Sequence, residues 1–209
     1  MIDRHMEFSL TGQLEFIAAW IFGTYLIAVF YAYPYVYVYG VKRTGKTKLL
    51  HIVKLTAFNA KKSSSISTPS IFRLIHETIS TLCFDEEEKL ARGERASEWR
   101  AVILSGYKRG DMVFRVEGEK TFRVLGFETY SAKIFANIAG IEDVVADRTI
   151  PFIMQRAVGP KGDVEVHPDD PEWRRVRTLP ALTALAHHSE VKEIYEKIHD
   201  GRVGGIRGI

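Results

Sequence analysis

Eight residues near the start of the chain have the types and spacing needed to bind nucleotide phosphates. Gly40 is followed, after four residues, by Gly45, Lys46 and Thr47, which is the P-loop pattern. In such a loop the backbone N–H groups and the N-terminus of the next helix point at the phosphates. The ammonium of Lys46 would neutralise the β- and γ-phosphates, and the hydroxyl of Thr47 would bind Mg²⁺.

The segments on both sides of this loop support that interpretation. Residues 34–39 are aromatic and β-branched, as in a buried strand, and apolar residues with helical spacing follow from Thr47 to Ala57. A P-loop requires a strand, a glycine loop and a helix in this order, whereas the alternative is a plain glycine turn. We expect the phosphates to contact the loop and its continuation: Gly40, Lys42, Arg43, Thr44, Gly45, Lys46, Thr47 and Lys48.

A second candidate element is the short apolar strand that ends in an acidic cluster at residues 82–86. Asp85 would hold Mg²⁺ through a water molecule, and Glu86 would polarise the attacking water. The alternative is the acidic first turn of a helix, because carboxylates favour helix N-termini. The P-loop about forty residues upstream favours the catalytic interpretation.

Two further polar residues are candidates for sensing and stabilising the charge that develops on the γ-phosphate. Asn137 follows a predicted strand at residues 132–136, and its alternative role is that of a turn residue. Arg148 precedes another predicted strand and could reach the γ-phosphate of a neighbouring subunit. Its alternative role is a surface salt bridge with Asp147 or Glu142. Arg156 is a weaker candidate for stabilising the same charge on the γ-phosphate.

The composition suits one globular domain with an appendage. Of the 209 residues 46% are hydrophobic, and the net charge of +3 permits an anionic partner without requiring one. The single cysteine, Cys83, excludes an internal disulfide framework, and no secretory signal opens the chain, so a cytoplasmic location is expected. A basic turn and hairpin with Lys108, Arg109 and Arg115 would face DNA, or would simply be solvated.

Residues 16–41 carry no charge, which raises the possibility of a membrane-spanning segment. Pro34 divides this run, so we expect a buried helix that is capped by Ser9 or Thr11 and extends to about Tyr33, followed by the strand that leads into the P-loop. A membrane-anchored ATPase is the less favoured alternative. Residues 1–10 are expected to be loosely structured.

The remaining elements follow from local patterns. Residues 61–65 read as a polar loop, residues 68–70 open a helix with proline in its first turn, and residues 98–105 are helical. Apolar and polar residues alternate at 112–117 and 121–125, which predicts a β-hairpin, and residues 150–154 are expected to form the last strand. We expect an ATPase core at residues 1–158. Residues 159–209 would be a linker, C-terminal helices with a break at Pro180, and a disordered glycine-rich tail.

With these residues assembled, the chain resembles the P-loop ATPase domains of the AAA+ and superfamily-three helicase lineage. It is most similar to helicase-like or primase-associated ATPases of archaea, phages and plasmids. The resemblance covers residues 20–156. The segments that carry it are residues 20–25, 35–47, 81–86, 105–110, 127–140 and 146–151.

The resemblance implies an α/β fold, a three-layer α/β/α sandwich with a mostly parallel sheet, and Mg²⁺-dependent ATP hydrolysis coupled to DNA. It also implies a homo-oligomeric ring in which Arg148 acts across the subunit boundary as an arginine finger and Asn137 is the first sensor. Such ATPases usually continue into a larger helical region, whereas here a glycine-rich tail follows the last helix. An ATP-binding switch or interaction module with little hydrolysis is therefore the alternative.

Overall fold

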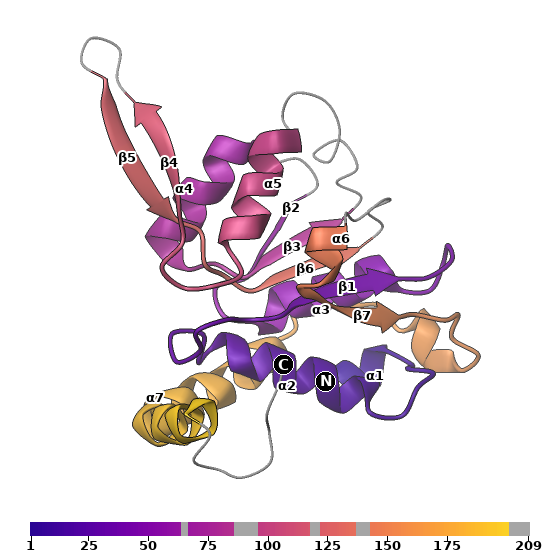
Figure 1. Ribbon diagram of the computed structural model, residues 1–209. Coiled ribbons are helices and arrows are strands. Elements are labelled where there is room, and N and C mark those ends of the chain that lie inside the picture. Colours follow the sequence, from indigo (N-terminus) through magenta and orange to yellow (C-terminus); the bar gives the residue numbers. More distant parts are fainter. Residues whose placement is uncertain (64–66, 86–95, 118–121, 137–142, 201–209) are drawn as a thin grey trace.

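A computed structural model describes residues 1–63, 67–85, 96–117, 122–136 and 143–200. Its centre is a five-stranded sheet in the order β2-β3-β6-β1-β7 (Figure 1). These strands are Lys61–Ser63, Leu82–Asp85, Lys133–Ala136, Tyr35–Tyr39 and Thr149–Ile153. All four neighbouring pairs are parallel, so every strand ends at the same edge of the sheet.

Helices pack on both faces of this sheet, which confirms the predicted α/β class. On one face, Val36 and Val38 of β1 join a core with α2 (Gln13–Thr24) and α3 (Lys46–Thr56). On the other face, Tyr35 joins a core with α4 (Thr68–Thr78) and α5 (Ala96–Ser105). Successive residues of β1 serve opposite cores because side chains alternate along a strand. The short helix α6 (Asp143–Ala146) leads into β7.

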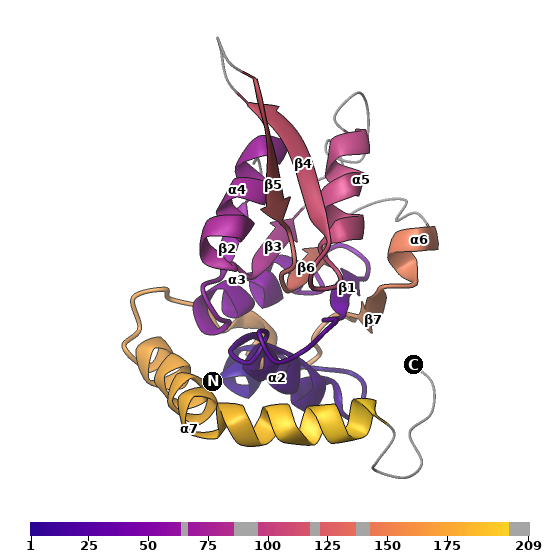
Figure 2. The ribbon, with the colours of Figure 1, turned by 60° about the vertical axis from the view of Figure 1, so that its left-hand side comes forward.

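The predicted hairpin is present and stands apart from the central sheet (Figures 1 and 2). Its strands are β4 (Met112–Glu117) and β5 (Arg123–Glu128), which pair antiparallel. Val113 and Phe127 pack toward α4 and α5, whereas Phe114 and Val116 are exposed. One face of the hairpin therefore anchors it to the body of the protein, and the other face is apolar and open.

A buried lysine lies at the amino end of β6. Lys133 is fully buried, and its Nζ donates hydrogen bonds to the carbonyls of Thr129 at 3.1 Å and Ser131 at 3.2 Å and to the Ser131 hydroxyl at 2.9 Å. Burial lowers the pKa of the Lys133 ammonium well below its usual range. Gly106, just after α5, packs against this group so closely that a Cβ there would lie 2.3 Å from Nζ.

The N-terminal predictions need correction. The apolar helix ends at Thr24 rather than near Tyr33, and its N-cap is Gly12 with a φ of 86°, not Ser9 or Thr11. The chain must turn back after α2, because the indole of Trp20 donates to the carbonyl of Pro34 just before β1. Residues 1–10 are not loose, since they include α1 (Ile2–His5) and the buried Met6. No helix in the described ranges is both long and apolar enough to cross a membrane.

The predicted polar loop at residues 61–65 was also wrong in part, because its first three residues form β2. Lys61 and Lys62 have little preference for strands, but they pair in register with Leu82 and Cys83 of the buried β3. A strand at the edge of a sheet commonly carries lysines. Tertiary pairing thus outweighs the local preference here.

The segment after β7 is more ordered than a linker. It contains a 3-10 turn at Pro160–Asp163 and then α7 (Glu172–His199). The predicted break at Pro180 does not interrupt α7, which is helical throughout and bends along its length in Figure 2. A proline inside a helix lacks one hydrogen bond and bends it. The predicted tail lies outside the described residues.

Candidate phosphate-binding site

The glycine loop lies where the carboxyl end of β1 meets α3, at the edge where all five strands end. Its backbone requires special conformations: Gly45 has a φ of 84° and Arg43 a φ of 63°. Gly40 packs so closely against β7's continuation that a Cβ would lie 2.2 Å from the Met154 carbonyl oxygen. Glycine at positions 40 and 45 is therefore needed for a close approach and for a left-handed turn.

Lys46 is held within this loop. It is buried, and its Nζ donates hydrogen bonds to the carbonyls of Gly40 at 2.6 Å and Val41 at 2.8 Å. The Thr44 hydroxyl donates to the same Val41 carbonyl at 3.0 Å. The loop thus curls around the lysine ammonium, and an anion seated in the loop would meet a positive charge that is already in place.

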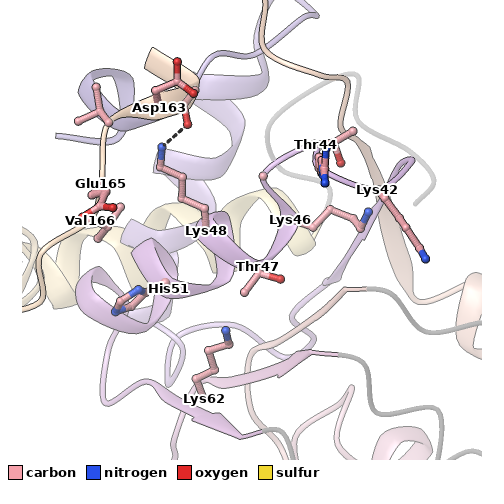
Figure 3. A pocket seen from close by; sticks show the side chains of 14 residues that line it. Lys42, Thr44, Lys46, Thr47, Lys48, His51, Lys62, Asp163, Glu165 and Val166 are labelled. Carbon is pink, nitrogen blue, oxygen red and sulfur yellow. Dashed lines mark hydrogen bonds between the residues drawn. The ribbon is translucent and has the colours of Figure 1, made fainter. Parts of the chain in front are cut away.

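The loop forms one wall of a cavity of about 670 Å³ (Figure 3). The predicted phosphate-binding residues 42–48 line it, together with His51, Lys62 and residues 162–166. Gly40 is not among the lining residues. Five of the lining side chains are lysine or arginine and two are carboxylates, so the cavity favours an anion. Its volume lies within the range of small-molecule sites, about 300–1,000 Å³.

Lys48 and the segment after β7 close the side of the cavity opposite the loop. The Nζ of Lys48 donates to the carbonyls of Gly162 at 3.0 Å and Lys161 at 3.2 Å. Burial lowers the pKa of the Lys48 ammonium, and the Asp163 carboxylate opposes that effect. Sequence reasoning treated residues 159–171 as a linker and had no local signal for this contact.

Asp85 ends β3 and is only 8% exposed. Its Oδ2 lies 3.1 Å from the Nζ of Lys62 on the neighbouring strand β2, and Lys62 in turn lines the cavity near Thr47 (Figure 3). The acidic residue that was predicted to hold the metal is thus connected to this cavity by a lysine that sequence reasoning missed. Lys62 lies fifteen residues after Thr47 and twenty-three before Asp85, so no local pattern assigned it to the predicted site.

The donor atoms at this edge suit a magnesium ion that arrives with a nucleotide. Mg²⁺ prefers oxygen ligands, keeps several waters, and commonly takes one or two carboxylates plus substrate phosphates. The Thr47 hydroxyl and the Asp85 carboxylate are such donors. Within the described ranges, no three histidine, cysteine, aspartate or glutamate side chains come together as a metal-binding group.

His51 is another lining residue that the motif does not include. Burial is the largest cause of the lowered pKa of its imidazole, and the charges of Lys54 and Lys62 act in the same direction. His51 is therefore biased toward its neutral form, so it can accept or donate a hydrogen bond in the cavity without adding charge.

Arg148 lies at the amino ends of the strands, whereas the glycine loop lies at their carboxyl ends. It immediately precedes β7, and its carbonyl accepts from the N–H of Tyr35, the first residue of β1. Its guanidinium lies over the ring of Tyr107, with Cζ 5.8 Å from the ring centroid. Its Nη1 is buried and has no hydrogen-bond partner among the described residues. Glu86 and Asn137 lie outside the described residues.

The cations of the predicted basic turn are engaged within the chain. Arg109 donates to the carbonyls of Ala28 and Phe30, and the Lys108 ammonium lies 5.8 Å from the centroid of Tyr31. Arg115 lies over the ring of Phe72 at 5.4 Å. These side chains hold the turn and the hairpin to the body of the protein. They do not form a continuous free face for a phosphate backbone.

The weaker candidate Arg156 follows β7, and its Nε donates to the carbonyl of Lys42 at 3.4 Å. It therefore lies beside the loop rather than in the cavity lining.

No protein-family model matches the chain, and a search of curated proteins finds none that is significantly similar. The functional argument consequently rests on the geometry and the chemistry of the site.

Proposed function

We propose that the protein is a P-loop ATPase that hydrolyses ATP with Mg²⁺, built on the three-layer α/β/α sandwich of the AAA+ and superfamily-three helicase lineage. One observation carries the proposal: the glycine loop after β1 opens into a cation-rich cavity that is also lined by Lys62, and Lys62 forms an ion pair with Asp85 at the end of β3. A parallel sheet collects its functional residues at the carboxyl ends of its strands, and this cavity lies at that edge.

The described residues have distinct roles in this proposal. The backbone N–H groups of the loop and the N-terminus of α3 bind the phosphates, and Lys46 exchanges its loop carbonyls for phosphate oxygens. Magnesium, bound with the nucleotide, would be held by Thr47 and, through water, by Asp85, and it would neutralise charge on the phosphates. Glu86 directly follows Asp85 in the chain and is proposed to polarise the attacking water.

Asn137 and Arg148 complete the proposal. Asn137 follows Ala136, the end of β6, and β6 lies between β1 and β3. That position suits a sensor of the γ-phosphate. The five residues of β7 place Arg148 about 17 Å from the carboxyl end of the strand, where the glycine loop lies. This separation argues against a role for Arg148 in its own subunit's site, so its proposed role is that of an arginine finger toward a neighbouring subunit in a homo-oligomeric ring.

The proposal includes DNA as a partner and the cytoplasm as the location. The mildly basic charge supports the first, and the single thiol, which is buried, supports the second.

The test is an ATPase assay with Mg²⁺, with and without single- and double-stranded DNA, run beside light scattering with and without ATP. We expect turnover that DNA accelerates and a larger particle with ATP. Absence of ATP binding would contradict the central proposal, and an unchanged rate with both DNAs would remove the DNA coupling.

A second candidate function is an ATP-binding switch with slow hydrolysis. The observation that favours it is the ion pair itself, because the Lys62 ammonium occupies one oxygen of the carboxylate that would serve the metal. An ammonium 3.1 Å from that carboxylate opposes a divalent cation there. The two candidates differ in whether the pair opens when the nucleotide binds.

We therefore expect Lys62→Met to lower the Mg²⁺ concentration needed for half-maximal nucleotide binding by roughly tenfold, because the competing charge is removed. A fluorescent ATP analogue titrated at a series of Mg²⁺ concentrations measures this. The matched control is Lys61→Met in the same strand, since Lys61 does not line the cavity. An unchanged Mg²⁺ requirement in Lys62→Met would show that the pair does not compete with the metal.

A further inference from the structure

A second cavity, of about 460 Å³, lies at the far end of α3 from the P-loop. Three elements form it: the last turn of α3 with the residues that follow, the start of β2, and the first turns of α7, which packs against α3. Three of the residues that line it are small: Ala57, Ala60 and Ala181.

The charges of this groove have one sign. Lys54, Lys61, Arg174 and Arg177 line it, and no carboxylate does. All four residues are exposed, and none of them forms an ion pair within the part of the chain that the structure describes. Like charges gathered in one groove repel one another, and an anionic ligand would relieve that cost.

The side chains that line the groove come from different elements, and Tyr25, which follows α2, and Arg177 of α7 are two of them. Burial raises the pKa of the Tyr25 phenol, and the Arg177 charge acts in the opposite direction. The Tyr25 hydroxyl donates to the Thr56 carbonyl at 2.7 Å near the end of α3. Tyr25 thus ties the α3 wall of the groove to the segment after α2, and Arg177 closes the groove from α7.

We propose that this groove binds the sugar–phosphate backbone of a nucleic acid. Repeated negative charges along one strand match four cations spread along a concave surface, and such contacts supply most sequence-independent affinity. An anionic bilayer surface is the alternative ligand, and the test below distinguishes it from a nucleic acid. The basic turn at residues 108–115 is a weaker candidate, because its cations are engaged within the chain.

The groove shares two elements with the phosphate cavity. The helix α3 begins at the P-loop and ends at the groove, and β2 contributes Lys62 to the cavity and Lys61 to the groove. A shift of α3 on nucleotide binding would therefore reach the groove directly. This coupling rests on the proposed ATPase function, whereas binding to the groove does not require it.

The test is fluorescence anisotropy with a labelled 20-nucleotide strand, in the absence of ATP and over a series of salt concentrations. Arg177→Gln is compared with Arg175→Gln, an exposed neighbour on α7 that does not line the groove. We expect Arg177→Gln to weaken binding on the order of fivefold at low salt and to reduce the slope of log affinity against log salt by about one. Arg174→Gln combined with Arg177→Gln should weaken binding by at least about tenfold.

Several outcomes would overturn the inference. They are absence of oligonucleotide binding by the natural protein, equal losses in Arg175→Gln and Arg177→Gln, or tight binding to phosphatidylserine vesicles that the double variant loses while oligonucleotide binding is unchanged. Binding of the fluorescent ATP analogue, measured on the same samples, reports separately on the phosphate cavity. The ATPase proposal can thus fail while the groove is confirmed, and the reverse also holds.

Discussion

Replacing Lys46 with alanine is expected to lower ATP hydrolysis by at least about 100-fold, because the variant loses the charge that meets the transferring phosphate. The Lys46 ammonium donates to the carbonyls of Gly40 and Val41, so the loop is shaped around it. Without it, those two carbonyls would face the phosphates directly. Both nucleotide binding and turnover should therefore fall.

Steady-state ATPase rates and titration with the fluorescent ATP analogue measure this loss. Lys42→Ala is the matched control, because Lys42 lines the same cavity but is exposed, and removing it should cost far less. Thermal unfolding of both variants shows whether the fold is retained. Hydrolysis by Lys46→Ala at close to the natural rate would contradict the assignment of this loop as the catalytic phosphate site.

Replacing Gly106 with alanine is expected to destabilise the protein by about 1–3 kcal/mol, as overpacking of a tight interior does. A Cβ at this position would lie 2.5 Å from the Thr129 carbonyl oxygen, 2.8 Å from the Val102 carbonyl oxygen and 2.3 Å from the Lys133 Nζ. The lysine end could move, but the two carbonyls belong to the backbone. The junction of α5, β5 and β6 would therefore have to shift.

Urea denaturation followed by circular dichroism measures the free energy of unfolding. Gly110→Ala is the control, since Gly110 has a φ of 95° but nothing within 4 Å of the added Cβ, so it reports the backbone strain alone. Its cost should be about 1 kcal/mol. If Gly106→Ala were no less stable than the natural protein, the close packing around Lys133 would be wrong.

The parts of the site that the sequence predicts are those with local patterns. The loop can be predicted from Gly40, Gly45 and Lys46. A phosphate-binding loop needs a close approach of its backbone, a left-handed turn and a positive charge at fixed spacing. The apolar residues of β3 before Asp85 likewise identify a buried strand. Each of these two signals lies within a short stretch of the chain, so no tertiary information is needed to recognise it.

The features that sequence reasoning missed depend on contacts between distant segments. Lys62 belongs to the site because β2 pairs with β3, and residues 162–166 belong to it because the chain returns to the P-loop after β7. The end of α2 is set by packing of Trp20 against Pro34, not by a break in the apolar pattern. The distance of Arg148 from the glycine loop and the groove near α7 likewise become visible only once the strand order and the helix packing are known.

The strand order has a consequence for how the protein is made. The strand that leads into the glycine loop, β1, is synthesised early, but its two neighbours are β6 and β7, which begin at Lys133 and Thr149. A nascent chain that has emerged only as far as α5 therefore contains the complete glycine loop without either strand that supports it. Parallel pairing across about a hundred residues is slow, because a long loop must be closed before the contacts form. If the loop binds ATP as we propose, this binding should appear as one of the last events of folding, and ATP would stabilise only chains whose sheet is already closed.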